Sequence, residues 1–291
     1  MFLPHKILEI KLLQILAEDT GQGDVTTSLI VAEGTNAEAD VIAKQSGVIA
    51  GIEEATILLK SLGLETKALA SDGQKVDARE VILSVSGNAR TILAAERTLL
   101  NLLSRMSGIA TATRNLVEKL SKAKLKTKVA CTRKTAPGLM YFDKKAVQVG
   151  GGDTHRLHLD DLILIKDNHI AIVGSIEKAV ETAKKHASIA KKVEVEVTRI
   201  EDILRAIQSG ADIIMLDNFP PKKVEEAVDL LEKNHLREKV LLEASGGITA
   251  ENMLDYASTG VDLVSLGELT QSPRALNVSL EISRVKKKSN C

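Results

Sequence analysis

Apolar and polar positions follow two different patterns along this chain of 291 residues. In its first part, apolar side chains recur at helical spacing over residues 4–18 and 88–122, whereas residues 37–87 alternate short β-branched segments with turns. Ser107 and Gly108 interrupt the second helical stretch, and this pair predicts two helices that meet there. The first part is therefore expected to form a small mixed sheet accompanied by helices.

The remainder of the chain repeats one unit, an apolar strand followed by an amphipathic helix. Each strand is a short run rich in Val, Ile and Leu, which is typical of parallel strands that are buried on both faces. A repeat of this kind builds either a doubly wound sheet or a β/α barrel. The predicted strands lie at 125–132, 162–167, 192–197, 212–217, 239–245 and 262–267.

Polar or glycine residues stand at the carboxyl end of each of these strands, and their distribution separates the two folds. An open sheet binds its ligand at one switch point, whereas a barrel collects side chains from all its strands around one mouth. We therefore predict a β/α barrel with a site at that mouth. The strand-end residues are Thr132, Arg133, Lys134, Lys166, Glu196, Asp217, Ser245, Gly246, Gly247 and Gly267.

The overall composition argues against several classes of function. Lys plus Arg and Asp plus Glu both number 39, so no global field favours nucleic acid or an anionic membrane, and an anion site needs local clustering of cations. Cys131 and Cys291 are the only cysteines, which is no disulfide framework and fits a reducing cytosol. Since no apolar run reaches membrane-spanning length, we expect a cytoplasmic protein, with room for two domains.

Cations do cluster in the middle of the chain. Arg133 and Lys134 form one adjacent pair, and His155 and Arg156 form another, both in turns rich in Gly, Pro and Thr, while Lys166 ends an apolar strand. Planar guanidinium groups match carboxylates bidentately, whereas a lysine supplies only a point charge. This clustering predicts a site for a small polyanion, although a single histidine is more often structural.

Acidic residues and glycine turns complete the predicted mouth. Glu196 lies inside its strand, and Glu194, two residues earlier, points to the same side. These carboxylates are either neutralised by a lysine such as Lys166 or bind the hydroxyl groups and a magnesium-bearing anionic group of a ligand. Asp217 is either a ligand of the same kind or a cap for the helix that follows it. Backbone N–H groups after the last two strands are suited to hold a phosphate. The predicted phosphate site comprises Ser245, Gly246, Gly247, Leu266, Gly267 and Glu268.

Three motifs follow one another in order: TRKTAPG at 132–138, GGGDTHR at 150–156 and LIKDNH at 164–169. Together with the string ERTLLNLLSRMSGIATATR, which begins at Glu96, they make almost the whole chain resemble the quinolinate phosphoribosyltransferase family. That family joins quinolinate to phosphoribosyl pyrophosphate with loss of pyrophosphate and CO2, and it produces nicotinate mononucleotide for NAD synthesis. The resemblance implies an α/β fold with an incomplete, six-stranded β/α barrel and a smaller N-terminal α+β sandwich domain.

The resemblance also implies how the chain is organised. The expected domains are the sandwich over 1–110, to which 272–291 returns, and the barrel over 111–271. The smaller domain of a second subunit is expected to cover the gap in the barrel, so the chain should act as a homodimer or within a higher oligomer. Arg97 should then reach the substrate carboxylates of the neighbouring subunit. Without the resemblance, a surface ion pair with Glu96 or Glu54 is the better interpretation.

At the mouth, the resemblance implies a role for each charged strand-end group. Arg133, His155 and Arg156 are expected to bind quinolinate. Magnesium is the expected cofactor, held through pyrophosphate near the two carboxylates. The implied catalytic residues are Lys134, Lys166, Glu196 and Asp217, and these four, together with Thr132, are also expected to bind substrate.

Two positions depart from the family pattern, and two other functions stay open. Met140 stands where the family often has arginine, and His158 stands where glycine is common. A related phosphoribosyltransferase acting on another anionic aromatic acid, such as nicotinate, would share the architecture, and product analysis with quinolinate would separate it. A non-catalytic anion-binding barrel would bind its ligand without turnover.

Overall fold

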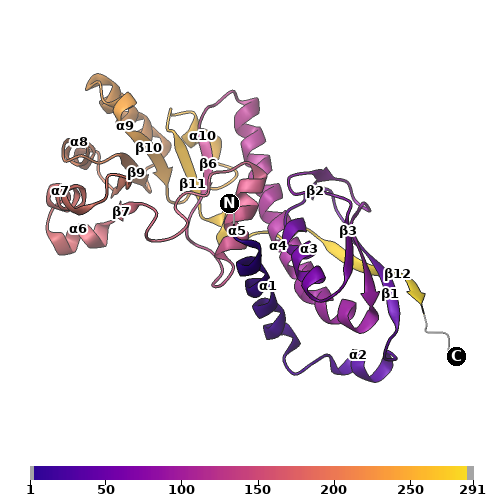
Figure 1. Cartoon of the computed structure of the whole chain (residues 1–291). Helices are drawn as coiled ribbons and strands as arrows, with labels where there is room; N and C mark the ends of the chain where they lie inside the picture. Colours follow the sequence, from indigo (N-terminus) through magenta and orange to yellow (C-terminus); the bar gives the residue numbers. More distant parts are fainter. Residues whose placement is uncertain (1–2, 287–291) are drawn as a thin grey trace. The chain divides into compact units, whose positions relative to one another are not determined.

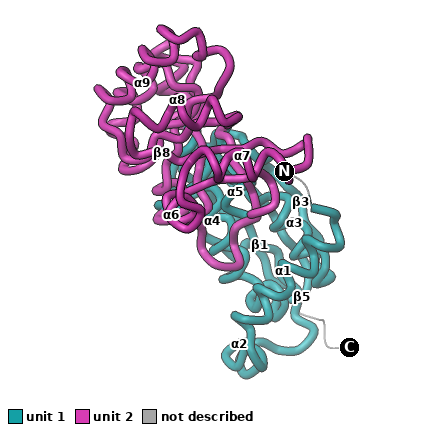
Figure 2. The backbone as a smooth tube through the Cα atoms, turned by 90° about the vertical axis from the view of Figure 1, so that its left-hand side faces the viewer, with its two compact units in different colours: residues 1–114, 142–151, 273–291 teal, residues 115–141, 152–272 magenta. Residues whose placement is uncertain are grey.

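The computed structural model describes residues 3–286 and divides the chain into two compact units, which Figure 2 draws in different colours. Each unit contains its own sheet. Cys291 lies outside the described residues. Of the described residues, the first unit contains 3–114, 142–151 and 273–286, and the second contains 115–141 and 152–272.

The first unit is built on a sheet with the strand order β12-β1-β5-β3 (Figure 1). Its pairings are antiparallel, so the expectation of a mixed sheet was wrong. Every second residue of β1 is buried, in a core shared with α3 and α4. The elements that lie wholly or for the larger part in this unit are α1 His5–Thr20, α2 Val25–Ile30, β1 Asn36–Ala43, β2 Gly47–Val48, α3 Ile52–Ser61, β3 Glu65–Ala68, β4 Lys75–Val76, β5 Val81–Asn88, α4 Ala89–Lys122, α5 Met140–Gly150 and β12 Val278–Lys286.

Helix α4 runs unbroken through Ser107 and Gly108, so the prediction of two helices at this point was wrong. The Ser107 hydroxyl lies within hydrogen-bonding distance of both the N–H and the C=O of Ala50, at 3.1 and 3.2 Å. A Cβ on Gly108 would lie 2.1 Å from the carbonyl oxygen of Arg274. The glycine therefore allows a distant segment to approach the helix, and it does not end the helix.

Helix α5 follows the first barrel strand in sequence, yet most of it belongs to the first unit. Its fully buried Asp143 accepts two hydrogen bonds from the guanidinium of Arg105, at 2.7 and 2.8 Å. Lys145 donates to Glu54 at 2.7 Å, and both of these side chains are buried. Breaking a buried ion pair leaves an uncompensated charge, so these contacts hold α5 in the first unit.

The second unit contains a parallel sheet with the strand order β6-β11-β10-β9-β8-β7, which confirms the predicted incomplete six-stranded β/α barrel. Within residues 3–286, the two end strands β6 and β7 do not pair with each other. A single bridge joins Ala130 of β6 to Asp153 in the segment between α5 and β7. The strands are β6 Lys128–Cys131, β7 Ile163–Ile165, β8 Val193–Val197, β9 Ile213–Asp217, β10 Leu241–Ser245 and β11 Leu263–Leu266.

Helices connect the successive barrel strands, as the strand and helix repeat predicts. Helix α7 contacts β7 and β8, and α8 contacts β8 and β9 (Figure 1). In the described part of the chain, no helix is long and apolar enough to cross a membrane. The helices of this unit are α6 Asp167–Val173, α7 Ile176–His186, α8 Glu201–Gln208, α9 Pro221–Lys233, η1 Arg237–Lys239, α10 Met253–Ala257 and α11 Glu268–Gln271.

Candidate active site

A cavity of about 540 Å³ lies at the carboxyl ends of the barrel strands. Parallel strands end at the same edge of their sheet, which is why residues from distant parts of the sequence meet there. Arg97, Leu266, Gly267 and Glu268 are not among the residues that line the cavity. The predicted site residues that do line it are Thr132, Arg133, Lys134, His155, Arg156, Lys166, Glu196, Asp217, Ser245, Gly246 and Gly247.

Two guanidinium groups line this cavity close enough to repel each other. Burial and the neighbouring charge of Arg133 both lower the pKa of Arg156, while Glu194 opposes the shift. Like charges brought together without a ligand raise the free energy of the empty site, and a dianion placed between them relieves that repulsion. The pair therefore suits a ligand that carries two adjacent carboxylates.

Glu196 is paired with a lysine in this structure. The Lys166 ammonium donates to its carboxylate at 2.6 Å, and the carboxylate is largely buried while the lysine is half exposed. The predicted neutralisation by Lys166 is therefore present. Binding of ribose by Glu196 stays a prediction.

Asp217 does not cap the helix that follows it. Helix α9 has Pro220 as its N-cap, and no side chain of the described residues supplies a capping hydrogen bond there. The Asp217 carboxylate instead accepts a hydrogen bond from the Asn218 side-chain amide at 2.6 Å. Asp217 also lines the cavity, and binding of a ligand by its carboxylate stays a prediction.

The glycine turn after β10 is shaped by Asn218. Gly246 has a φ of 86°, and a Cβ there would lie 2.4 Å from the Asn218 side-chain oxygen and 2.7 Å from its backbone nitrogen. Only glycine fits this position without displacing Asn218. The turn after β11 is tied to the same edge, because Glu268 accepts a hydrogen bond from the N–H of Ala250 at 2.8 Å.

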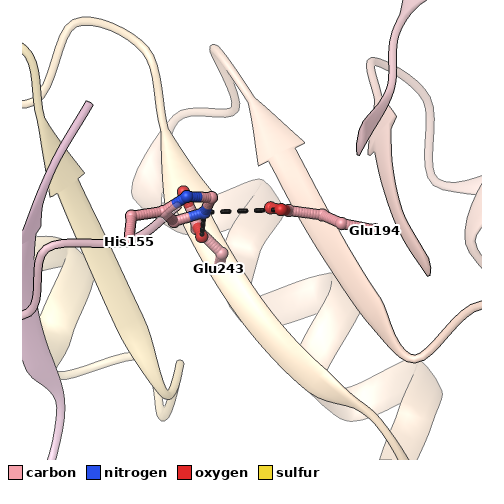
Figure 3. Close-up of side chains that lie close together, drawn as sticks. All are labelled: His155, Glu194 and Glu243. Atoms are coloured by element: carbon pink, nitrogen blue, oxygen red, sulfur yellow. Dashed lines mark hydrogen bonds and ion pairs between the residues drawn. The ribbon is translucent and has the colours of Figure 1, made fainter. Parts of the chain in front are cut away.

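His155 contacts two buried glutamates that the sequence did not single out as ligands (Figure 3). Its Nε2 lies 3.1 Å from Glu243 Oε2 and 3.3 Å from Glu194 Oε2, and the ring points toward both carboxylates. Glu194 is 0% and Glu243 1% exposed. We call these three residues the buried trio. The only signal for Glu243 is an acidic residue inside an apolar strand, two positions before the predicted phosphate turn.

The buried trio holds one extra proton through the neutral pH range. Burial alone would lower the pKa of His155, but hydrogen bonds and charges from Glu194 and Glu243 outweigh burial and raise this pKa to about 10. Burial also raises the pKa of Glu194. Because the N–H of Arg156 donates to His155 Nδ1 at 2.7 Å, Nδ1 carries no proton. The ring's own proton is therefore on Nε2, and the extra proton of the trio belongs to the carboxylates.

We expect the free energy of unfolding to fall as pH rises from about 6.5 to about 10. In that window the folded protein keeps a proton that unfolded His155 has already lost, so rising pH favours the unfolded state. Urea unfolding at several pH values measures the slope. His155→Asn should reduce the slope, whereas His186→Gln, at the exposed end of α7, should leave it unchanged. An identical slope in His155→Asn would contradict the assignment.

Arg97 lies on helix α4 of the first unit, where its side chain is exposed. Glu54, the alternative partner considered from the sequence, is buried and bound to Lys145. Within residues 3–286, no acidic side chain forms an ion pair with Arg97. The alternative of a surface ion pair therefore has no support in this structure.

The chain matches known proteins along nearly its whole length. Residues 24–107 match the quinolinate phosphoribosyl transferase N-terminal domain, and residues 109–281 match the C-terminal domain. A probable nicotinate-nucleotide pyrophosphorylase (carboxylating) from Methanothermobacter thermautotrophicus is 44% identical over 273 residues, which cover 94% of this chain and 98% of that protein. A solved nicotinate-nucleotide pyrophosphorylase from Francisella tularensis has a TM-score of 0.88 at 41% identity, covering 97% of this chain and 98% of that one.

The likeness to a more distant enzyme is one of fold alone. Human nicotinic acid phosphoribosyltransferase has a TM-score of 0.62 at 12% identity, covering 98% of this chain and 75% of that one. The two domain matches and the identity above 40% are far closer than this, and they agree with the charged barrel mouth. The chain therefore belongs to the quinolinate phosphoribosyltransferase family.

Proposed function

We propose that the residues at the barrel mouth together catalyse one reaction, the synthesis of nicotinate mononucleotide from quinolinate with loss of CO2. The chain joins quinolinate to phosphoribosyl pyrophosphate and releases pyrophosphate and CO2, a step of NAD biosynthesis. The observation that carries this conclusion is the cavity itself, in which four cationic side chains face two carboxylates beside a glycine turn. The residues concerned are Arg133, Lys134, Arg156, Lys166, Glu196, Asp217, Gly246 and Gly247.

Quinolinate is the part of the reaction that the guanidinium groups recognise. Arg133 and Arg156 form planar forks that can each hold one carboxylate, and their mutual repulsion is relieved by the dianion. His155, with the partner's Arg97, completes the set that we assign to quinolinate binding. Both ring nitrogens of His155 have hydrogen-bond partners within the protein, Glu243 at Nε2 and the N–H of Arg156 at Nδ1.

Phosphoribosyl pyrophosphate is the part that the carboxylates and lysines serve. Displacement of pyrophosphate at the anomeric carbon builds positive charge on the ribose. We assign the stabilisation of this charge to Glu196 and Asp217, which line the cavity. Lys134 and Lys166 offset the charge of the departing pyrophosphate. The oxygen donors of Glu196 and Asp217 are of the kind that magnesium prefers, and magnesium bound with the pyrophosphate would neutralise part of its charge.

The substrate itself drives the loss of CO2. Once its ring nitrogen is bonded to the ribose, that nitrogen is cationic. When the bond between C2 and the carboxyl carbon breaks, CO2 leaves and the electron pair stays on C2, where the adjacent positive charge stabilises it. A proton from solvent then bonds to C2. The protein's contribution to this step is to hold the ring and its second carboxylate.

The homodimer is part of the same proposal. The barrel sheet has two unpaired end strands, and Arg97 belongs to the other unit of the chain. A second copy that supplies its Arg97 to the mouth would complete the quinolinate site. A cytoplasmic location is proposed on the scarcity of cysteine, since the sequence contains only Cys131 and Cys291.

A turnover assay tests the function directly. Purified protein with quinolinate, phosphoribosyl pyrophosphate and Mg²⁺ should release CO2 and form nicotinate mononucleotide. Nicotinate in place of quinolinate should give no product. Binding of quinolinate without turnover would support the non-catalytic alternative and overturn the proposal.

Replacing Arg133 by Lys should weaken quinolinate binding about tenfold, because a point charge replaces a planar fork. Binding of phosphoribosyl pyrophosphate should change much less, since the total charge is kept. Separate titrations with each substrate measure the two effects. Arg205→Lys, on the exposed surface of α8, is the matched control and should affect neither. An equal loss for both substrates would count against the role given to Arg133.

A further inference from the structure

His155 is held in a strained backbone conformation by hydrogen bonds on both sides. The φ angle of its backbone is 50°, in the left-handed region that most residues other than glycine adopt only at a cost in free energy. Its N–H donates to the Asp153 carboxylate at 2.7 Å, and its Nδ1 accepts from the N–H of Arg156 at 2.7 Å. The ring is therefore fixed to the backbone of the residue that carries one of the quinolinate-binding guanidiniums.

The other ring nitrogen is fixed to the barrel interior (Figure 3). Nε2 lies between Glu243 on β10 and Glu194 on β8, which approach it from two strands. Both carboxylate oxygens of Glu194, and Oε1 of Glu243, are buried with no hydrogen-bond partner in the part of the chain that the structure describes. Glu194 Oε2 approaches His155 Nε2 only as an ion pair, at 3.3 Å. A buried carboxylate with an unused oxygen is costly, so a structural core would favour apolar residues at these positions.

The spacing of the buried trio also resembles that of a metal site, and the ring tautomer decides between the two interpretations. One ligand atom from each of the three residues lies within 4.8 Å of the others. A neutral histidine that binds a metal through Nε2 carries its proton on Nδ1 and donates it to an acceptor. Here Nδ1 faces a donor, the N–H of Arg156, so the ring proton is on Nε2, where Glu243 accepts it at 3.1 Å.

We propose that Glu194 and Glu243 are positioning residues for quinolinate binding, which they serve through His155 and the backbone of Arg156. Glu243 accepts the Nε2 proton, Glu194 forms an ion pair with the same nitrogen, and together they fix the ring. The ring in turn fixes the N–H of Arg156. This connection holds the strained turn in place and directs the Arg156 side chain toward Arg133 at the mouth. The inference rests on the proposed function, because it assumes that Arg156 binds quinolinate.

The buried carboxylates act here by where they place an acceptor oxygen. Their negative charge lies close to a site that we assign to a dianion, so this charge by itself weakens the binding of that ligand. An amide that keeps an oxygen at the same place should therefore preserve binding. A shorter carboxylate keeps the charge but withdraws the oxygen from the ring by one methylene. Position and charge consequently make opposite predictions for Gln and Asp at residue 243.

Glu243→Asp should raise the KM for quinolinate about tenfold, while kcat and the KM for phosphoribosyl pyrophosphate change much less. Glu243→Gln should remain close to the wild-type enzyme in all three, because its side-chain oxygen still accepts the Nε2 proton. Steady-state kinetics with each substrate varied in turn measures this split. Both substitutions are conservative, and we expect both variants to fold. Circular dichroism, measured alongside the kinetics, checks this.

Asp202→Ala is the matched control. Asp202 is a buried, ion-paired carboxylate of the same unit that does not line the cavity. Its loss should lower the thermal stability and leave both KM values unchanged. The inference is overturned if Gln is more harmful than Asp, or if Asp shifts both KM values equally or neither. Turnover of quinolinate by the wild-type enzyme is measured first, so a failure of the proposed function is seen separately.

Discussion

Glu196→Gln is expected to lower kcat roughly a hundredfold, with a smaller rise in the KM for phosphoribosyl pyrophosphate. The amide keeps the shape of the side chain and still accepts a hydrogen bond from Lys166, which lies 2.6 Å from the carboxylate. It loses the negative charge that would face the positively charged ribose of the transition state. A contact that is stronger in the transition state than in the bound substrate affects kcat more than KM.

The measurement is steady-state kinetics with phosphoribosyl pyrophosphate varied at saturating quinolinate. Glu177→Gln removes a carboxylate from the surface of α7 in the same unit and should retain the wild-type rate. A folded Glu196→Gln variant with wild-type kcat would return Glu196 to a purely structural role as the partner of Lys166.

Mixing two inactive variants is expected to restore about a quarter of the wild-type activity. Arg97→Ala removes a group that we assign to the partner's mouth, and Lys134→Ala removes one from the chain's own mouth. In a dimer formed from one copy of each, one mouth has an intact Lys134 and receives an intact Arg97. Random pairing makes half of the dimers mixed, and half of their sites are intact, which gives about one quarter.

Each variant is assayed alone and then after mixing under conditions that allow subunit exchange. Mixed dimers are counted with two different affinity tags, so that exchange is demonstrated independently of activity. Proven exchange without recovery would show that Arg97 serves no mouth other than that of its own chain, or none at all.

The sequence by itself determined the barrel and most of the residues at its mouth. The six apolar runs could be recognised because parallel strands buried on both faces are apolar throughout. Their ends could be placed together because parallel strands of one sheet end at the same edge. Both rules need only the order of residues along the chain, so the sequence predicts that Arg133, Lys166 and Asp217 converge, and all three line the cavity.

Only the tertiary structure decided the features that depend on partners far away in the sequence. The sequence predicts a helix break at Gly108, because local propensity does not show that the carbonyl of Arg274 approaches this residue. The placement of α5 depends on Asp143 and Lys145 finding Arg105 and Glu54 in the first unit, since a buried charge goes where its counterion is.

The buried trio is the clearest case of a contact between residues far apart in the sequence that the sequence alone does not predict. His155 and Glu243 are 88 positions apart, and their contact depends on a strained turn meeting a strand interior. Sequence reasoning assigns a lone histidine either to the core or to a ligand, because residue type alone does not say which nitrogen faces which group. The three-dimensional arrangement supplies that information, since hydrogen-bond geometry settles the tautomer and the tautomer settles what the ring can bind.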